Sequence, residues 1–449
     1  MIRLMDRMFL PVGHGAFYCE RFWCDRFLDS LKFKVANEPA WTKASERLII
    51  QKHTINIVYD CGTLRDPDAL QSELKKTFNP GDIIDAVFIS HLHTDHFNGL
   101  KHLADRCKIQ RIYLPHMEPV DLRLMQLDYI THKLTSSNNA EINDVDFADS
   151  VLDNRDKEDN EDNEDNETED PIETLKGQFE TLIRKEVVSV SDDRHTDFTS
   201  TGVHYVDNNT PRSVSVQQFS RCQGLSPFDD WYFKAFCIYN QEVVQTVKEG
   251  LREIINDELM EDNPLRENDD TRFPELVAEL IENIKKGKAK TDFSALLEGI
   301  RAVYKKIGHF NVNSLVLYSG CDNKSGLLIE RPRRCPNCMN DKPGCLYTGD
   351  FDAKHHWDVL ENSLKNEWDS IGCIQIPHHG SEHNFNSNFL DNKIFPGPAL
   401  CHVISARCGQ GSKHPSQSVL AQYVQGRCQP IIVTQDKLSL AHWRIVKLP

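Results

Sequence analysis

Four side chains that could bind a metal ion lie within six residues of this chain, directly after an apolar segment. The apolar segment covers residues 83–89, and the hexad reads His91-Leu92-His93-Thr94-Asp95-His96. In an extended backbone His91 and His93 face the same side, so both can hold one ion, and Asp95 and His96 can reach a second ion where the chain turns. Imidazole nitrogens and carboxylate oxygens are donors that zinc prefers. A surface cluster of histidines is the alternative, but it does not explain this density of ligands after a buried strand.

Other polar clusters also follow short apolar segments. The segments that predict strands are 8–15, 48–62, 83–89, 111–115, 231–238, 314–318, 345–348, 371–376, 401–405 and 431–434. When several strand ends each present Asp or His, a sandwich of sheets can assemble one site at its edge. We therefore expect residues from distant parts of the chain to complete the site that the hexad begins.

Composition limits the setting in which such a site would work. The charged start of the chain lacks the apolar stretch of a signal peptide, and no run of about 18 apolar residues follows. Without an export signal, the 14 cysteines favour reduced thiols or metal ligands in the cytoplasm. We expect no membrane association.

The net charge of -16 is distributed unevenly along the chain. Residues 153–170 contain eleven acidic side chains against Arg155 and Lys157, a net of -9, which leaves -7 elsewhere. The overall acidity argues against a generally basic nucleic-acid-binding surface, but it leaves room for a local positive groove.

Residues 126–306 differ in character from the flanking sequence and are interpreted as an insertion. The acidic tract 153–170 is too charged and too poor in apolar residues to fold alone, so we expect a disordered surface loop that acts as a spacer. Helices are expected near 241–259, 274–286 and 293–306, the first with Val244, Val247 and Leu251 at helical spacing. The insertion could contact protein partners. Residues 1–125 and 307–449 would form the two halves of the main domain.

The hexad is similar to the His-x-His-x-Asp-His signature of the metallo-β-lactamase fold, and further motifs extend the likeness. They are Tyr59-Asp60-Cys61-Gly62, Asn313-Ser314-Leu315-Val316-Leu317, Tyr347-Thr348-Gly349-Asp350, Pro377-His378-His379-Gly380-Ser381 and Lys413-His414-Pro415. Together they resemble the hydrolase domains of ComEC-type DNA-uptake competence proteins and their soluble relatives. The likeness covers residues 8–115 and 310–436.

This resemblance implies an α/β fold, the αββα sandwich of the family, with two zinc ions in the active site. It implies that His91 and His93 hold one ion, that Asp95, His96 and His379 hold the other, and that Asp350 bridges both. Asp60 would orient a metal-binding histidine. His379 is favoured over His378 as the ligand, although the sequence leaves that choice open. The implied catalytic residues are Asp95, Asp350 and His414, the last of which could contact a leaving group or an oxyanion.

The chain departs from the family pattern in its first loop. The branch usually reads Val-Gly-x-Gly-Asp-Ala, whereas residues 12–17 read Val-Gly-His-Gly-Ala-Phe and lack the Asp. His14 in this loop is therefore an alternative ligand or a group behind the ligands. His116, after the segment 111–115, is a candidate for a further metal histidine or an ordinary surface residue.

A second zinc site is suggested by the cysteines in the loop 321–345. Cys335-Pro336-Asn337-Cys338 has the spacing of a zinc knuckle, with Cys321 before it and Cys345 after it. One structural zinc ion would stabilise a loop too polar to pack, and free thiols are the alternative. A redox role is disfavoured because the strand-to-helix context that lowers a thiol pKa is missing.

A paired-metal site can attack several substrates, so the fold does not define the reaction. The resemblance favours phosphodiesters, with nucleic acid as one substrate, and the acidity of the chain favours small or single-stranded substrates. The alternatives are hydrolysis of carboxylic esters, thioesters or lactams, and a metal-binding regulatory module without turnover.

Overall fold

The computed structural model describes most of the chain in separate ranges. They are residues 3–23, 54–116, 119–136, 202–206, 212–215, 231–237, 241–259, 271–290, 292–307, 314–321, 327–330, 342–391, 400–409, 413–426 and 428–447. The chain forms two compact units. The first consists of Met1–Pro115, Phe179–Cys237 and Ser314–Pro449, and the second of His116–Gln178 and Ile238–Asn313.

The first unit contains two large sheets. The eight-stranded sheet has the order β12-β17-β1-β2-β3-β5-β7-β8. Its strands are β12 (Leu327–Glu330), β17 (Ala441–Lys447), β1 (Arg3–Phe9), β2 (Phe17–Trp23), β3 (Thr54–Cys61), β5 (Ala86–Phe88), β7 (Arg111–Pro115) and β8 (Gly202–Val206). Pairing is antiparallel from β12 to β3 and parallel from β3 to β8.

The seven-stranded sheet has the order β16-β15-β14-β13-β11-β10-β9. Its strands are β16 (Ile431–Val433), β15 (Cys401–Ser405), β14 (Ile371–Gln375), β13 (Gly344–Tyr347), β11 (Val316–Cys321), β10 (Trp231–Phe236) and β9 (Arg212–Ser215). Strands β13 to β16 pair in parallel and the others antiparallel. A small separate sheet pairs β4 (Ile83–Ile84) with β6 (Lys108–Ile109).

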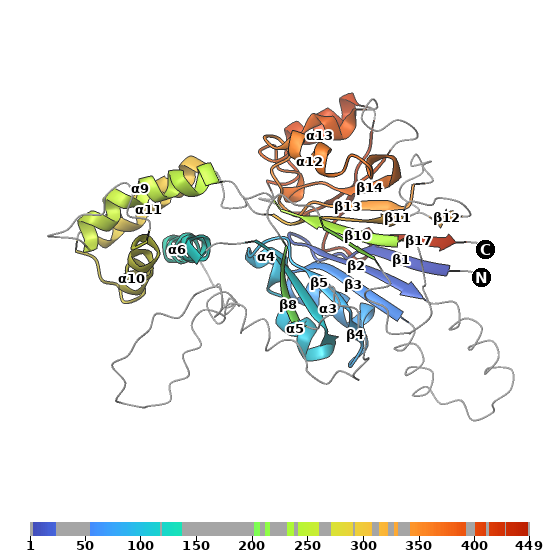
Figure 1. Ribbon diagram of the computed structural model, residues 1–449, viewed down its shortest axis with the longest axis horizontal. Coiled ribbons are helices and arrows are strands. Elements are labelled where there is room, and N and C mark those ends of the chain that lie inside the picture. Colours follow the sequence, from blue (N-terminus) through green and yellow to red (C-terminus); the bar gives the residue numbers. More distant parts are fainter. Residues whose placement is uncertain are drawn as a thin grey trace. The chain divides into compact units, whose positions relative to one another are not determined.

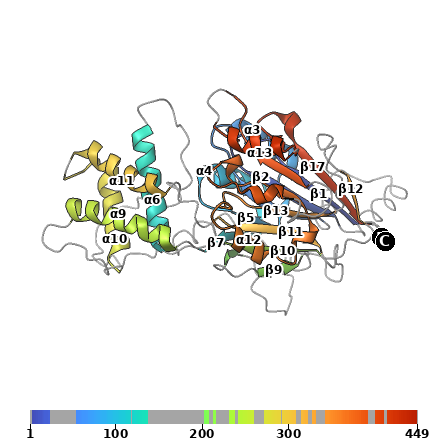
Figure 2. The same ribbon diagram turned by 90° about the horizontal axis from the view of Figure 1, so that it is seen from above.

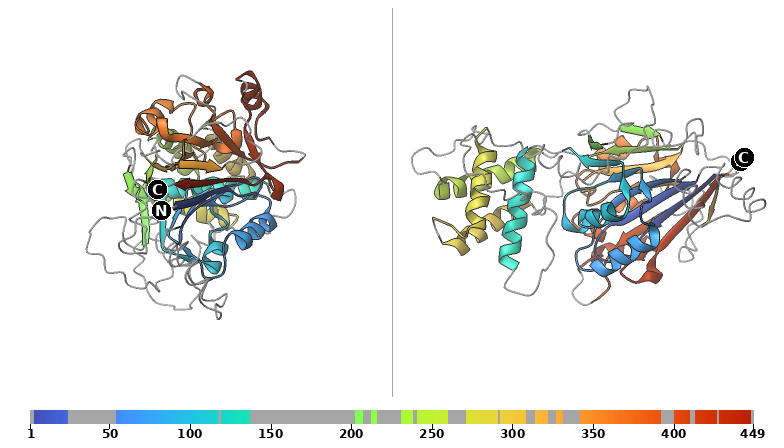
Figure 3. Two further views of the ribbon diagram at one scale, coloured as in Figure 1. Left: turned by 90° about the vertical axis from the view of Figure 1, so that its right-hand side faces the viewer. Right: turned by 90° about the horizontal axis from the view of Figure 1, so that it is seen from below.

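The two large sheets pack face to face around one apolar core (Figures 1 and 3). Phe9, Tyr18 and Tyr59 from the first sheet meet Tyr347 from the second, with ring centroids 5.1–5.8 Å from that of Tyr347. Such aromatic contacts bury large apolar areas and fix the spacing of the sheets.

Helices cover the outer faces of this unit. The helices α3 and α5 lie outside the first sheet, and α12 and α13 outside the second (Figure 1). The bounds are α3 (Pro67–Thr77), α4 (Thr94–Phe97), α5 (Leu100–Arg106), α12 (Trp357–Ser363) and α13 (Gln417–Gln425), with single 3-10 turns at η3 (Trp368–Ser370), η4 (His378–Gly380), η5 (Ser387–Leu390) and η6 (Lys437–Ser439). The predicted α/β class is confirmed, and the layers agree with the expected sandwich.

The second unit is helical, with α6 (Pro119–Ser136), α9 (Gln241–Leu259), α10 (Phe273–Lys285) and α11 (Phe293–Ile307) (Figure 2). Apolar residues of α6 and α9 pack with those of α10 and α11 in a core of their own. The three predicted helices are thus confirmed within one residue at each end, because their apolar stripes are regular. Helix α6 was not predicted from the sequence.

Several predicted boundaries differ from the structure. The first strand covers Arg3–Phe9 rather than 8–15, because residues 10–16 form the turn toward β2. Asp85 separates β4 from β5 within the predicted strand 83–89 and accepts a hydrogen bond from the Asn56 backbone N–H at 2.8 Å. The predicted insertion 126–306 contains β8, β9 and β10, which belong to the sheets of the first unit. The acidic tract 153–170 lies outside the described residues. No helix in the described ranges is long and apolar enough to cross a membrane.

Parallel pairing explains why polar residues from distant segments meet. Asp60 lies near the end of β3 and the hexad follows β5, and these strands run in parallel. Asp350 follows β13 and His379 follows β14, which also run in parallel. The carboxyl ends of parallel strands share one edge of a sheet, so each sheet presents its cluster at one edge.

Candidate metal centre

The hexad forms the turn from β5 into the short helix α4. His93 has an extended backbone and precedes the first residue of the helix, whereas Asp95 and His96 lie within it. His91 and His96 are buried, each with no more than 3% of its surface exposed. The turn therefore directs two imidazoles into the interior of the first unit.

The first ligand group combines His91 and His96 with Asp350. The Nε2 atom of His91 lies 3.6 Å from Asp350 Oδ2, and that of His96 lies 3.2 Å from Asp350 Oδ1. Asp350 directly follows the turn formed by Thr348 and Gly349. Gly349 has a φ of 53°, and a Cβ atom added to it would lie 2.4 Å from the Cβ of Ser90. A glycine is required there because the two turns approach so closely.

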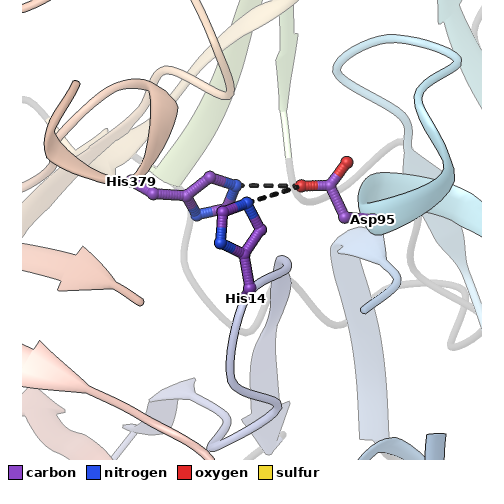
Figure 4. A group of neighbouring side chains, drawn as sticks. All are labelled: His14, Asp95 and His379. Atoms are coloured by element: carbon purple, nitrogen blue, oxygen red, sulfur yellow. Dashed lines mark hydrogen bonds and ion pairs between the residues drawn. The ribbon is translucent and has the colours of Figure 1, made fainter. Parts of the chain in front are cut away.

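The second ligand group combines His14, Asp95 and His379 (Figure 4). His379 Nε2 lies 3.0 Å from Asp95 Oδ2, and His14 Nε2 lies 3.7 Å from the same oxygen. His379 Nδ1 bonds the backbone oxygen of Ser405 at 2.8 Å, which orients Nε2 toward Asp95. The three residues come from the β1–β2 turn, α4 and η4, as the figure shows.

The two groups adjoin at His96. Its Nε2 atom lies 3.7 Å from Asp95 Oδ2 as well as 3.2 Å from Asp350 Oδ1. One imidazole nitrogen therefore faces a carboxylate of each group. An arrangement of this kind can hold two metal ions close enough to act on one substrate.

Asp60 and Ser90 fix the orientation of His96 from behind. Asp60 Oδ2 accepts a hydrogen bond from His96 Nδ1 at 2.8 Å and from the Ser90 hydroxyl at 2.7 Å, and its Oδ1 accepts from the Ser90 N–H at 2.6 Å. With Nδ1 engaged, Nε2 is left to face the metal position. Asp60 has a φ of 54°, a left-handed conformation that Asp and Asn tolerate better than most residues. The predicted orienting role of Asp60 is thus supported by its contacts.

Gln375 and Asn384 hold the two loops of the second sheet, and neither was predicted from the sequence. Gln375 Oε1 accepts hydrogen bonds from the N–H groups of Thr348 and Gly349 at 2.7 and 2.8 Å. Asn384 Nδ2 donates to the Asp350 backbone oxygen at 2.7 Å, and its Oδ1 lies 2.7 Å from His378 Nδ1. These buried amides link the Asp350 turn to the histidine turn.

Burial and opposite charges act against each other in this site. Burial alone would lower the pKa of His96, but the carboxylates of Asp350, Asp95 and Asp60 raise it well above its usual range. Burial would raise the pKa values of Asp95 and Asp350, but the neighbouring histidines hold both well below their usual range. The surrounding carboxylates thus favour positive charge at His96. A bound cation would supply such a charge.

The residues of the first ligand group fit a zinc ion. The Nε2 atoms of His91 and His96 are buried and make no hydrogen bond within the described part of the chain. Ligand atoms about 2.0–2.2 Å from a tetrahedral zinc ion lie roughly 3.3–3.6 Å apart. The His91–Asp350 and His96–Asp350 distances of 3.6 and 3.2 Å are close to that spacing.

The other predicted site residues lie at varying distances from the two groups. His93 is half-buried, and its ring centroid lies 4.7 Å from that of His91, outside both groups. His378 Nε2 lies 3.6 Å from Asp350 Oδ2, so this histidine faces the first group while His379 belongs to the second. The ring of His414 lies 5.6 Å from that of His378. His116 follows β7 and belongs to neither group.

The grouping differs from the expected division of ligands. His96 groups with His91 and Asp350, because Asp60 turns its Nε2 toward Asp350. His14 takes a place beside Asp95 and His379 that the sequence assigned to His96. The sequence signal for His14 was its position between two glycines in a turn after a strand.

The cysteines of the predicted structural zinc site are only partly described. Cys321 and Cys345 belong to the apolar core between the sheets, which gives them a packing role. Cys335 and Cys338 lie outside the described residues. The four-cysteine zinc site stays a prediction.

Comparison with known proteins identifies a family model that matches part of the chain. Residues 48–177 match the family model described as Metallo-beta-lactamase superfamily, a range that includes Asp60 and the hexad but not Asp350 or His379. No curated protein matches the chain. The superfamily consists mostly of metal-dependent hydrolases and commonly binds zinc. Residues 48–177 are thus similar to the metallo-beta-lactamase superfamily, and the candidate ligands contributed by the second sheet lie outside the matched range.

Proposed function

We propose that this chain is a zinc-dependent phosphodiesterase or nuclease with two metal ions in its active site. The observation that carries the proposal is the pair of His/Asp groups that adjoin at His96, in which the ligand atoms of each group lie within 4.8 Å of one another. Paired metal sites of this type stabilise both the attacking and the leaving oxygen of a phosphoryl transfer.

Five of the proposed ligands belong to the two groups, namely His91, Asp95, His96, Asp350 and His379. His93 lies outside the groups, but its ring is 4.7 Å from that of His91, and we propose it as a further ligand of the first ion. Bound zinc would supply Lewis acidity and a water acidic enough to attack near neutral pH. Nitrogen-rich donor sets suit zinc, whereas Mg²⁺ and Ca²⁺ prefer oxygen donors.

The residues around the ligands have roles of their own in this proposal. Asp60 holds the Nδ1 proton of His96, and the Ser405 carbonyl holds that of His379, so both rings present Nε2 to the centre. Asp350 is anchored through its backbone, whose N–H bonds the Ser314 hydroxyl at 3.0 Å. His414 would contact the leaving group or an oxyanion, because it lies beside the rings of His14 and His378.

The choice of phosphodiesters rests on the likeness of the local motifs to the DNA-uptake branch. A net charge of -16 disfavours a long duplex footprint, since duplex binding depends on neutralising many phosphates. We therefore propose small or single-stranded phosphodiesters, nucleic acid included, as substrates.

The test combines metal analysis with a substrate panel. Purified protein loaded with zinc is analysed for metal per chain and assayed on bis(p-nitrophenyl) phosphate, single-stranded DNA, RNA, duplex DNA, and ester, thioester and lactam substrates. His93→Ala and Asp350→Ala should each reduce phosphodiester hydrolysis by at least 100-fold, in the range of losses on removing a ligand or transition-state group. An exposed histidine variant, His355→Ala, is the matched control.

Three outcomes would contradict the proposal in different ways. Full activity in His93→Ala and Asp350→Ala would exclude the metal centre as the site of catalysis. Hydrolysis of esters or lactams without phosphodiesters would change the substrate class. Stable metal binding without turnover of any substrate in the panel would favour a regulatory module.

A further inference from the structure

The β1–β2 turn carries an imidazole that the proposed ligand set does not use. His14 Nε2 lies 3.7 Å from Asp95 Oδ2, and the ring centroids of His14 and His379 lie 4.3 Å apart (Figure 4). A distance of 3.7 Å is too long for a hydrogen bond. It is close to the roughly 3.3–3.6 Å that separates two ligand atoms on one zinc ion.

Backbone hydrogen bonds fix this turn to the rest of the site. The Leu64 N–H donates to the His14 carbonyl at 2.7 Å, and the Ala16 N–H donates to the Asp95 carbonyl at 3.0 Å. The Thr63 hydroxyl also donates to the Val12 carbonyl at 2.7 Å. The residues on both sides of His14 are thus tied to the end of β3 and to Asp95 itself. A side chain on such a supported backbone can be placed with the accuracy that a metal ligand needs.

Two glycines permit this close approach. A Cβ on Gly15 would lie 2.3 Å from the Gly62 carbonyl oxygen, and a Cβ on Gly62 would lie 2.5 Å from the Asp95 carbonyl carbon. Three backbone segments therefore contact one another directly, and they carry His14, Asp60 and Asp95. The backbone that carries His14 is therefore held in place by direct packing against these segments.

We propose that His14 is a ligand of the second metal ion, together with Asp95 and His379. The inference rests on the proposed metal centre but adds a ligand from the first turn of the chain. The three donors are two neutral imidazoles and one carboxylate, a set that zinc accepts while leaving a position open for water or substrate. The second ion would then depend on a turn that the six-residue motif does not contain.

The test measures metal binding directly. Wild-type protein, His14→Ala and His14→Gln are stripped of metal and titrated with Zn²⁺ against a chromophoric chelator, and parallel samples are titrated with Co²⁺ and followed by visible absorption. We expect two binding steps in the wild type. In both variants the weaker or second step should lose at least 10-fold in affinity, and the Co²⁺ bands of that step should change, while the first step stays within about twofold. His355→Ala, an exposed histidine paired with Asp352, should behave as wild type.

The outcomes separate this inference from the proposed function. Wild-type binding of both ions in His14→Ala and His14→Gln would overturn the ligand role of His14, even if activity fell. Loss of the second step in a wild type that hydrolyses no phosphodiester would support the ligand role and refute the proposed function. If the wild type bound no more than one ion, both would fail. Circular dichroism of the metal-free variants verifies the fold, and His14→Gln keeps a polar side chain if His14→Ala is unstable.

Discussion

Replacing Asp60 by Asn isolates the orientation of a metal ligand from the ligand itself. Asp60 does not belong to either ligand group, yet its Oδ2 accepts hydrogen bonds from His96 Nδ1 at 2.8 Å and from the Ser90 hydroxyl at 2.7 Å. Asn has nearly the same shape and tolerates the φ of 54° found here, so backbone strain should not contribute. Asp60→Ala would be a poorer test, because alanine tolerates this positive φ less well than asparagine.

The magnitude follows from the contacts that change. In Asp60→Asn the amide oxygen can still accept from the Ser90 N–H, but the amide nitrogen then faces the donor at His96 Nδ1. To avoid two opposed donors, His96 would carry its proton on Nε2, the atom that faces Asp350. Losing one charge-assisted hydrogen bond costs about 1.5–3 kcal/mol. Losing a group that orients a metal ligand typically costs about 10–100-fold in metal affinity, or about 1.4–2.8 kcal/mol. The two figures agree.

The assay is a zinc competition titration of metal-free Asp60→Asn and wild type at one pH. We expect the affinity for zinc to fall by about 10–100-fold, with circular dichroism unchanged. Asp68→Asn removes an exposed carboxylate in the first turn of α3 and is the matched control. Zinc affinity in Asp60→Asn within twofold of wild type would refute the reasoning, because His96 would then need no orienting group.

Three further predictions concern pH and the buried core. Burial lowers the pKa of His402 to about 4, whereas a histidine in the unfolded chain has a pKa near 6.5. As the pH falls, the unfolded chain therefore binds a proton before the folded protein does. From this residue alone, the free energy of unfolding should fall by about 3 kcal/mol between pH 7 and pH 4. Urea unfolding should show a shallower pH slope in His402→Gln, and an equal slope would contradict this. Because the neighbouring carboxylates raise the pKa of His96, we expect zinc to displace a proton from it, so zinc affinity should rise with pH. Calorimetry in two buffers should detect this proton release, and heats that do not depend on the buffer would contradict it. The Nε atom of the buried Arg7 lies 2.7 Å from the Glu20 carboxylate, so Glu20→Ala leaves a buried charge without its partner and should destabilise the protein by about 3–5 kcal/mol. The double variant Arg7→Met with Glu20→Leu should recover most of this loss. Equal melting temperatures of Glu20→Ala and wild type would exclude a stabilising pair.

Much of the fold could be predicted because its elements have regular local patterns. The segment 111–115 is β7 and the segment 401–405 is β15, residue for residue, since both are compact apolar runs between polar turns. The helices α9, α10 and α11 carry clear apolar stripes. Local sequence is sufficient where one periodicity defines both the element and its buried face.

The remaining elements depend on contacts that local sequence does not reveal. The strand β10 pairs with β11, although the helices α9, α10 and α11 lie between them along the chain. The strand β17 pairs with β1 at the opposite end of the sequence. Pairings of this length cannot be inferred from periodicity, which is why three sheet strands fell within the predicted insertion.

The candidate site likewise contains residues that the sequence predicts and residues that it does not. The hexad, Asp350 and His379 were predicted from motifs, and the structure brings most of these residues together. Gln375 and Asn384 were missed because each resembles an ordinary strand or loop amide, and only their hydrogen bonds to the Asp350 turn distinguish them. Residues that hold a site in place rarely share a local pattern, because their role depends on what packs against them.

The placement of the proposed ligands would make metal binding depend on the fold of the whole first unit. His14 and the hexad come from one sheet, whereas Asp350 and His379 come from the other, and the helical unit interrupts the chain between them. No single segment holds a complete ligand group, so the site can form only when the two sheets have packed around their shared core. The free energy of binding at the proposed metal site would then be coupled to the packing of the two sheets. Changes far from the metal, such as those at the buried Arg7–Glu20 pair, would therefore weaken metal binding to the extent that they loosen the contact between the sheets.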